Sequence, residues 1–287
     1  MSHPLPSLPE PVLPGLMRRR GVPALAAAER LWWFAALGFL CTFVIMSIVQ
    51  QGDARLLNGE SVWAKPLKFA LSSAVHFGSI ALAVHWLRPA WTASAWMTAL
   101  AAASVAAAVF EVAYIALQGA LGASSHFNVS TPLHAALWSL MAAAAVIVLA
   151  PMAVIGLLAA LDDRARWPAP VRAGVAVGML GGALLTLVTA FRMGANMSHF
   201  IGAPPSWDSL VPLTGWSWRG ADLRPAHFLA THMAQAIPLL SLAASPLVPP
   251  RAAIVAVVAF ATSWTGLTIL VFGNALAGGS LATLLAS

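Results

Sequence analysis

Long apolar segments alternate with short polar ones along most of this chain. Seven of the segments are close to 20 residues or longer and nearly free of charge, and about 20 residues is the length that an α-helix needs to cross a bilayer. The polar segments between them carry turn residues such as Gly52-Asp53 and Pro249-Pro250. The apolar segments cover approximately residues 31–49, 66–87, 93–117, 133–158, 173–197, 226–246 and 252–275. The pattern predicts an all-α polytopic membrane protein, a bundle of seven transmembrane helices.

The composition favours the same fold class. Of the 287 residues, 60% are hydrophobic and 8% are charged, whereas soluble domains carry roughly 25% charged residues. The net charge of +6 comes from arginines scattered among the loops. Because nucleic-acid binding needs a clustered basic face, that function is not indicated. We expect the lipid bilayer as the partner, and the sequence leaves the oligomeric state open.

The ends of the chain differ from its apolar centre. Residues 1–28 are rich in proline and are predicted to form a disordered cytoplasmic arm, before a single membrane domain over residues 29–287. The tail after Gly278 is too short for an eighth span. The long connection 197–225 mixes tryptophans with charges and is expected to fold as a cap over the outer ends of the helices.

Orientation follows from the positive charges on the two sides of the predicted spans. One side, which includes the N-terminal arm, carries nine Lys and Arg residues and the other carries five. The nine are Arg18, Arg19, Arg20, Arg30, Arg88, Arg164, Arg166, Arg172 and Arg251; the five are Arg55, Lys65, Lys68, Arg219 and Arg224. The N-terminus is therefore predicted inside and the C-terminus outside. Short loops and the preference for arginine over lysine favour a bacterial inner membrane.

Polar residues recur at helical spacing within the predicted spans, mostly near their outer ends. Such residues usually face the bundle interior or a water-filled cavity. They are Lys65, Lys68, Ser72, His76 and Ser79; Glu111, Tyr114 and Gln118; Arg192, Asn196 and His199; and His227, Thr231, His232 and Gln235. At 1.5 Å per residue, Glu111, Arg192 and His232 are expected about 10 Å below the outer helix ends. This asymmetry predicts one polar cavity that opens outward.

Glu111 and Arg192 are the two charges placed deepest in that half. Each is costly alone in hydrocarbon, so we expect them to pair. One interpretation is a structural salt bridge between the third and fifth spans. The other is a carboxylate ligand or proton acceptor that the arginine orients, and both remain open.

The histidines favour a metal or haem site in the same half. Imidazole binds zinc, copper and haem iron, and we take His232, His199 and Glu111 as the candidate metal ligands. His76, His134 and Gln235 are the candidate cofactor contacts. His227 and His232 are five residues apart and point about 140° away from each other on a helix, so they do not form the helical zinc pair with a spacing of four.

The leading functional hypothesis is a metal- or haem-dependent membrane enzyme, an oxidoreductase or a hydrolase, acting on a periplasmic or lipid-soluble substrate. His227 and His126 would serve as general acid–base groups, Arg192 would orient Glu111 or neutralise an anion, and Lys68 would attract a negative group. A relay of haems across the membrane is disfavoured, because the inner half offers only His85. The alternatives are a transporter or channel that uses the same cavity, and a ligand sensor without turnover.

Overall fold

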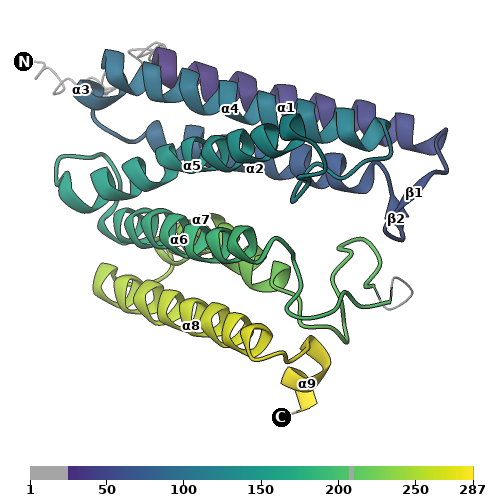
Figure 1. Cartoon of the computed structure of the whole chain (residues 1–287). Helices are drawn as coiled ribbons and strands as arrows, with labels where there is room; N and C mark the ends of the chain where they lie inside the picture. The colour runs from purple at the N-terminus through teal and green to yellow at the C-terminus, as the bar shows by residue number, and fades with distance from the viewer. Residues whose placement is uncertain (1–24, 207–209, 287) are drawn as a thin grey trace, which may run out of the picture.

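Seven long helices make up the computed structural model, which describes residues 25–206 and 210–286 (Figure 1). They are α1 Ala27–Gln51, α2 Ala64–Val84, α4 Ala95–Ala120, α5 Pro132–Leu161, α6 Ala169–Asn196, α7 Arg224–Ala244 and α8 Pro250–Leu276. Each begins and ends within a few residues of a predicted span. The all-α prediction is confirmed. Residues 1–24, most of the predicted arm, lie outside the described residues.

Six of these helices are long and apolar enough to cross a membrane, and α7 is not among them. Its 21 residues include Arg224, His227, His232 and Gln235, which lower its hydropathy. Length and composition therefore support an integral membrane protein with six candidate spans, and the predicted count of seven is not confirmed. Pro151 does not end the fourth segment, because α5 continues through it to Leu161.

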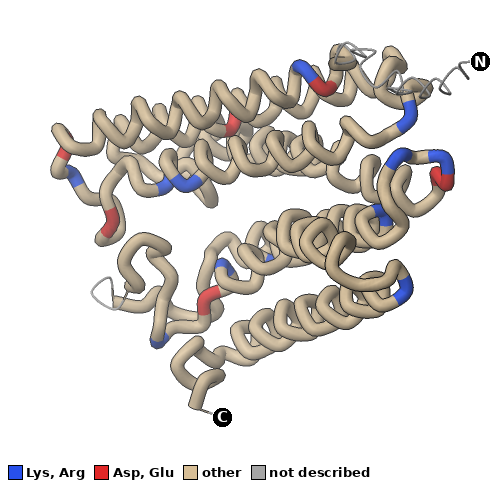
Figure 2. Tube along the Cα trace, turned by 180° about the vertical axis from the view of Figure 1, so that it is seen from behind, with Lys and Arg blue, Asp and Glu red and all other residues tan. Residues whose placement is uncertain are grey.

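The helices form two packed groups that join at one seam (Figure 1). Helices α1, α2 and α4 pack together, α5 packs against α4 and α6, and α6, α7 and α8 pack together. Consecutive long helices run in opposite directions, so every second connection lies at the same end of the bundle. We call the end with the connections 52–63, 121–131 and 197–223 the hairpin end. The end with residues 85–94, 162–168 and 245–249 is the arginine end (Figure 2).

The arginine half of the bundle is filled by apolar side chains. Trp32, Phe77, Met97 and Ile155, from four different helices, are each at most 1% exposed and belong to one packed cluster. The one polar atom of the Trp32 ring is satisfied there, since its Nε1 donates to Ser104 Oγ over 3.1 Å. Inside a bilayer such packing stabilises the fold through van der Waals contact. The bundle therefore has a packed apolar core toward its arginine end.

Glycines allow α6 and α7 to approach closely. The Cα of Gly174 faces the Ser241 side chain, Gly178 faces Pro238, and Gly182 faces the backbone of α7 at Ala234. Small residues of this kind are typical of close helix packing in membranes. This close contact between α6 and α7 fixes the position of α7, which carries several of the candidate site residues.

Four short elements complete the fold. Strands β1 Leu56–Leu57 and β2 Glu60–Ser61 pair antiparallel around Asn58-Gly59, whose φ angles are 53° and 78°. Helix α3 covers Pro89–Thr92 and α9 covers Leu281–Ala286. The hairpin was not predicted, although the dipeptide Asn58-Gly59 is a strong short-range signal for a two-residue hairpin turn. It places Glu60 beside the start of α2.

Candidate functional site

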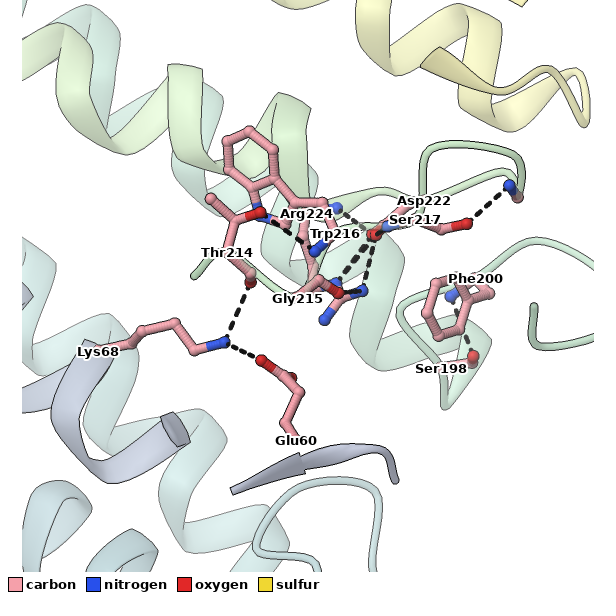
Figure 3. Close-up of polar contacts among 11 residues, drawn as sticks. Glu60, Lys68, Ser198, Phe200, Thr214, Gly215, Trp216, Ser217, Asp222 and Arg224 are labelled. Atoms are coloured by element: carbon pink, nitrogen blue, oxygen red, sulfur yellow. Dashed lines mark hydrogen bonds and ion pairs between the residues drawn. The ribbon is translucent and has the colours of Figure 1, made fainter. Parts of the chain in front are cut away.

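Lys68 connects three chain segments at the hairpin end. Its Nζ donates to Glu60 Oε1 over 2.9 Å and to the carbonyl oxygen of Thr214 over 3.0 Å (Figure 3). Lys68 belongs to α2, Glu60 to β2 and Thr214 to the connection between α6 and α7. The negative group that Lys68 contacts in this structure is a protein carboxylate, that of Glu60. Its charge is therefore already paired.

The connection from residue 197 to 223, the cap loop, is folded in its described parts 197–206 and 210–223. Buried Asp222 accepts from the backbone N–H of Ser217 over 2.8 Å and from Arg224 Nη2 over 2.7 Å (Figure 3). The same guanidinium donates to the carbonyl of Gly215 over 2.6 Å and stacks 5.0 Å from the Phe200 ring centroid. One buried carboxylate and one arginine thus hold the cap loop in a defined shape against α7.

Gly215 provides a test of that shape. Its φ is +67°, and a Cβ at this position would overlap the Glu60 carboxyl group. Gly202 in the same loop also has positive φ, +77°, but a Cβ there would meet nothing within 4 Å. Gly202→Ala should cost about 1–2 kcal/mol of backbone strain, while Gly215→Ala adds a collision with Glu60. We expect faster tryptic cleavage at exposed Arg219 in Gly215→Ala than in Gly202→Ala; equal rates would contradict the contact.

Lys65 lies one turn before Lys68 and makes no ion pair in the described part of the chain. Its Nζ is 5.8 Å from the centroid of the Phe69 ring. That ring packs on Tyr114 of α4, and its centroid is 5.5 Å from that of His126. Among the carboxyl groups whose charges act on Lys65 is Glu111 of α4, which is 9% exposed. An unpaired ammonium group is therefore surrounded by aromatic and polar side chains.

Three buried polar atoms on the elements around Lys65 have no hydrogen-bond partner among the described residues: Tyr114 Oη and Gln118 Oε1 on α4, and His199 Nδ1 in the cap loop. Tyr114 and Gln118 are 6% and 5% exposed, and the backbone beside Gln118 packs on Pro66 at the start of α2. A buried polar group without a partner costs about 1–3 kcal/mol. A bound water, an ion or another ligand, or a catalytic role, accounts for atoms of this kind.

Two histidines in the connections beside this region stay neutral at pH 7. Burial, followed by the charge of Lys65, holds the pKa of His126 well below its ordinary value of 6.5, and the same two causes act on His199. Protonation of His227 would lower the pKa of both rings further. The ring of Phe127 bridges them, with centroids 6.2 Å from His126 and 4.9 Å from His199. A neutral imidazole can accept a proton.

The depressed pKa values of His126 and His199 predict that acid destabilises the fold. In the unfolded chain these rings take up protons as the pH falls through about 6.5, but in the folded chain they do so only at lower pH. The unfolded state then binds more protons, and stability falls by at most about 1.4 kcal/mol per pH unit for each ring.

We expect a lower melting temperature at pH 5 than at pH 7.5, and a smaller difference in the double variant His126→Gln/His199→Gln. His134→Gln is the control, because this ring lies at the start of α5 and bonds only to nearby Thr131 and Ser130. An unchanged pH dependence in the double variant would contradict the assignment.

We call the residues gathered here the hairpin-end cluster. It consists of Lys65, Glu111, Tyr114, Gln118, His126, His199 and His227. Side chains from α2, α4, α7 and two connections contribute to it. The hollows of about 400 and 470 Å³ that open elsewhere on the surface contain none of these residues. The cluster lies beside the cap loop, since His199 belongs to that loop and Lys68, one turn beyond Lys65 on α2, bonds to Thr214 in it.

A second polar row lies deeper, between α2 and α7. Gln235 Nε2 donates to Ser79 Oγ over 3.2 Å, and Gln235 Oε1 lies 3.2 Å from His232 Nδ1. His232 lies near both His76 and His227. His76 is 8% exposed and its Nε2 donates to the carbonyl of Val148 on α5 over 3.0 Å. The predicted cofactor contacts His76 and Gln235 thus have protein partners.

The expected pairing of Glu111 with Arg192 is wrong. No ion pair of the described residues joins them, and Arg192 is exposed on α6. The positive charge that acts on Glu111 is that of Lys65. The physical reason is that the stripe through Arg192 turns away from α4, so the lysine on α2 takes the place that the sequence assigned to the arginine.

The predicted metal ligands His232, His199 and Glu111 are not brought together. Across residues 25–206 and 210–286, no three His, Cys, Asp or Glu side chains are close enough to hold a metal ion. His232 belongs to the deeper row beside Gln235, while His199 in the cap loop packs on Phe127. These donors do not fit a shared metal site.

The sequence interpretation leaves two members of the cluster without a role. Tyr114 and Gln118 lie on a predicted polar stripe with no function assigned to them, and Glu60, which bonds to Lys68 beside the cluster, lies on none. The signals were the helical spacing of Glu111, Tyr114 and Gln118, and the Asn58-Gly59 turn that places Glu60. The Nδ1 of His227, a predicted acid–base group, is 2.8 Å from Thr189 Oγ1.

Comparisons of the chain with protein-family models, with curated proteins and with solved structures give no match. The fold and the hairpin-end cluster are therefore the basis of the functional proposal.

Proposed function

We propose that the chain is a seven-span protein of the bacterial inner membrane, with its N-terminus in the cytoplasm and the hairpin end outside. Helix α7 packs between α6 and α8, and a position inside the bundle accounts for its lower hydropathy. The excess of arginine at the opposite end supports this orientation. Residues 29–287 then form one membrane domain, and the cap loop covers its outer face.

We further propose that the hairpin-end cluster binds a small anionic molecule and exchanges protons with it, so that the protein is a membrane enzyme. The observation that carries this proposal is that the cluster combines the Lys65 amino group, which has no ion-pair partner among the described residues, with three buried polar atoms that have no hydrogen-bond partner among those residues. An anion would pair with Lys65 and accept hydrogen bonds from the donors among those atoms. Neutral His126 and His199, with Glu111, would supply general acid–base catalysis.

The substrate would reach the cluster from the outer side or from the lipid, as the sequence suggested. Lys68, Glu60 and Arg224 fix the cap loop beside the cluster, and entry would require the loop to move. The metal-dependent version of the hypothesis is not carried forward, because its three donors lie apart. Haem remains a prediction, and the presence or absence of a Soret band in the absorption spectrum of the purified protein tests it.

Thermal unfolding of the purified full chain tests anion binding. The probes are phosphate, sulfate, acetate and glycerol phosphate, each as the same sodium salt, with glycerol as the uncharged control. A ligand that binds the folded state raises its stability by RT ln(1 + [L]/Kd). We expect at least one anion to raise the melting temperature in a saturable way. If every anion matches sodium chloride of equal ionic strength, the proposal fails.

A transporter is the second candidate, and the deeper row of His76, Ser79, His232 and Gln235 favours it. These side chains continue the polar lining from the cluster toward the middle of the bundle between α2 and α7. Uptake of the stabilising anion into proteoliposomes would distinguish the two. Accumulation inside the vesicles supports transport, whereas chemical conversion of the anion without uptake supports the enzyme.

A further inference from the structure

A polar hollow lies at the arginine end, away from the hairpin-end cluster. It has a volume of about 470 Å³ and sits where α5 ends, beside the start of α3. Its lining consists of Arg88, Trp91, Leu158, Leu161, Asp162, Asp163 and Arg164. The hollow thus combines guanidinium groups, carboxylates and leucines in one place.

Asp162 is the buried acidic residue that lines this hollow. It is 6% exposed, and its Oδ2 accepts from Trp91 Nε1 over 2.7 Å and lies 2.8 Å from Arg88 Nε. Its Oδ1 accepts from the backbone N–H of Arg164 over 3.1 Å. The Arg88 guanidinium also stacks 5.0 Å from the Trp91 ring centroid. These contacts fix Arg88 through its Nε, and among the described residues its two terminal nitrogens have no other partner.

The surroundings carry more positive than negative charge. Arg164 is exposed, and its guanidinium makes no hydrogen bond or ion pair among the described residues. Arg166 and Arg172 donate to backbone carbonyls beside the hollow, at Leu87 and Asp162. Arg88 and Arg164 line the hollow with Asp162 and Asp163, so the excess of positive charge comes from Arg166 and Arg172 beside it. Figure 2 shows the basic residues gathered at this end. An anion would therefore be attracted here.

The other wall is apolar and faces outward from the bundle. Leu161, the last residue of α5, is 73% exposed, and Leu157 one turn earlier is 46% exposed. Leu158 lines the hollow itself. Exposed leucines that run from a basic hollow along a membrane-spanning helix suit a molecule with a charged head and a hydrocarbon tail.

We propose that this hollow binds an anionic phospholipid. The phosphate group pairs with Arg88 and Arg164, and an acyl chain lies along Leu157, Leu158 and Leu161 on α5. Basic pockets between transmembrane helices are suited to acidic head groups on the cytoplasmic side. The site holds its lipid on the leaflet opposite the cap loop, and it is independent of the anion site beside that loop.

Native mass spectrometry of the full chain tests the proposal. The detergent-purified protein is mixed with equal amounts of phosphatidylglycerol and phosphatidylcholine, and the bound fraction of each is measured. We expect one phosphatidylglycerol to remain bound preferentially. Arg164→Gln should weaken that binding about five-fold, since one arginine near a membrane surface contributes about 1 kcal/mol. Because the Arg164 side chain is exposed and bonds to no other described residue, this variant keeps its fold.

Two controls complete the experiment. Arg251→Gln removes an exposed arginine from the same end but outside the hollow, and it should bind lipid as the original chain does. Glycerol phosphate is the soluble competitor with the same charged group. Equal retention of both lipids, or equal loss in Arg164→Gln and Arg251→Gln, would overturn the site. Displacement of the lipid by equimolar glycerol phosphate would assign the hollow to free phosphate compounds and overturn the role of the leucines.

Discussion

Replacing Lys65 with methionine should abolish most anion binding while leaving the fold intact. The side chain keeps its length but loses its charge, and no carboxylate of the described residues loses an ion-pair partner. A hydrogen bond to a charged group contributes about 1.5–3 kcal/mol, which corresponds to binding that is roughly 10- to 100-fold weaker. Titration of the stabilising anion by calorimetry measures the loss.

Lys68→Met is the matched control, one turn further along α2. Its ammonium is already bound to Glu60 and to the Thr214 carbonyl, so its removal should loosen the cap loop and speed tryptic cleavage at Arg219. Lys65→Met should leave that cleavage rate unchanged. Anion affinity equal to that of the original chain in Lys65→Met would refute the proposed role of Lys65, whatever Lys68→Met does.

Gly178→Leu should destabilise the bundle more than either glycine substitution in the cap loop. A Cβ at this position would lie 2.7 Å from Pro238 Cδ and 3.0 Å from Ile237 Cβ, so a leucine would force α6 and α7 apart. Overpacking of a core typically costs about 1–3 kcal/mol for smaller insertions, and we expect at least the upper value. Thermal unfolding in detergent, with loss of helical circular dichroism, gives the measurement.

Gly194→Leu is its control on the same helix. A Cβ there would meet nothing within 4 Å, so the leucine would face outward and add helix propensity of nearly 1 kcal/mol relative to glycine. The melting temperature of Gly194→Leu should stay at or above that of the original chain. Equal destabilisation by both substitutions would mean that α6 and α7 do not meet along Gly178.

The helices were predictable because a membrane span is a local property of sequence. Uninterrupted apolar length identifies α1 or α5 without reference to the rest of the chain. The number of spans was harder to predict from hydropathy. Helix α7 combines Arg224, two histidines and Gln235 with apolar residues. Its place in the bundle comes from packing against the glycines of α6, a tertiary property that hydropathy alone does not contain.

The prediction that Arg192, Asn196 and His199 share one face of the fifth span was wrong for a geometric reason. Arg192, Asn196 and His199 lie on one line only if the helix continues through all three. Helix α6 ends at Asn196, and Met197 adopts the left-handed conformation with φ of 50°. His199 therefore enters the cluster from the cap loop, while Arg192 stays on the exposed face of α6. Where a helix ends was the missing information, and the sequence has no Gly or Pro there to indicate it.

The bond from His76 to the Val148 carbonyl determines how a proton could travel along α2. A carbonyl oxygen can only accept, so the Nε2 of this ring must carry hydrogen. Hydrocarbon offers that oxygen no water as a replacement partner. The Nε2–H group is consequently occupied by its hydrogen bond to Val148, and only Nδ1 can exchange protons. A hydrogen-bonded wire that descends from the outer surface would end at this ring instead of passing through it.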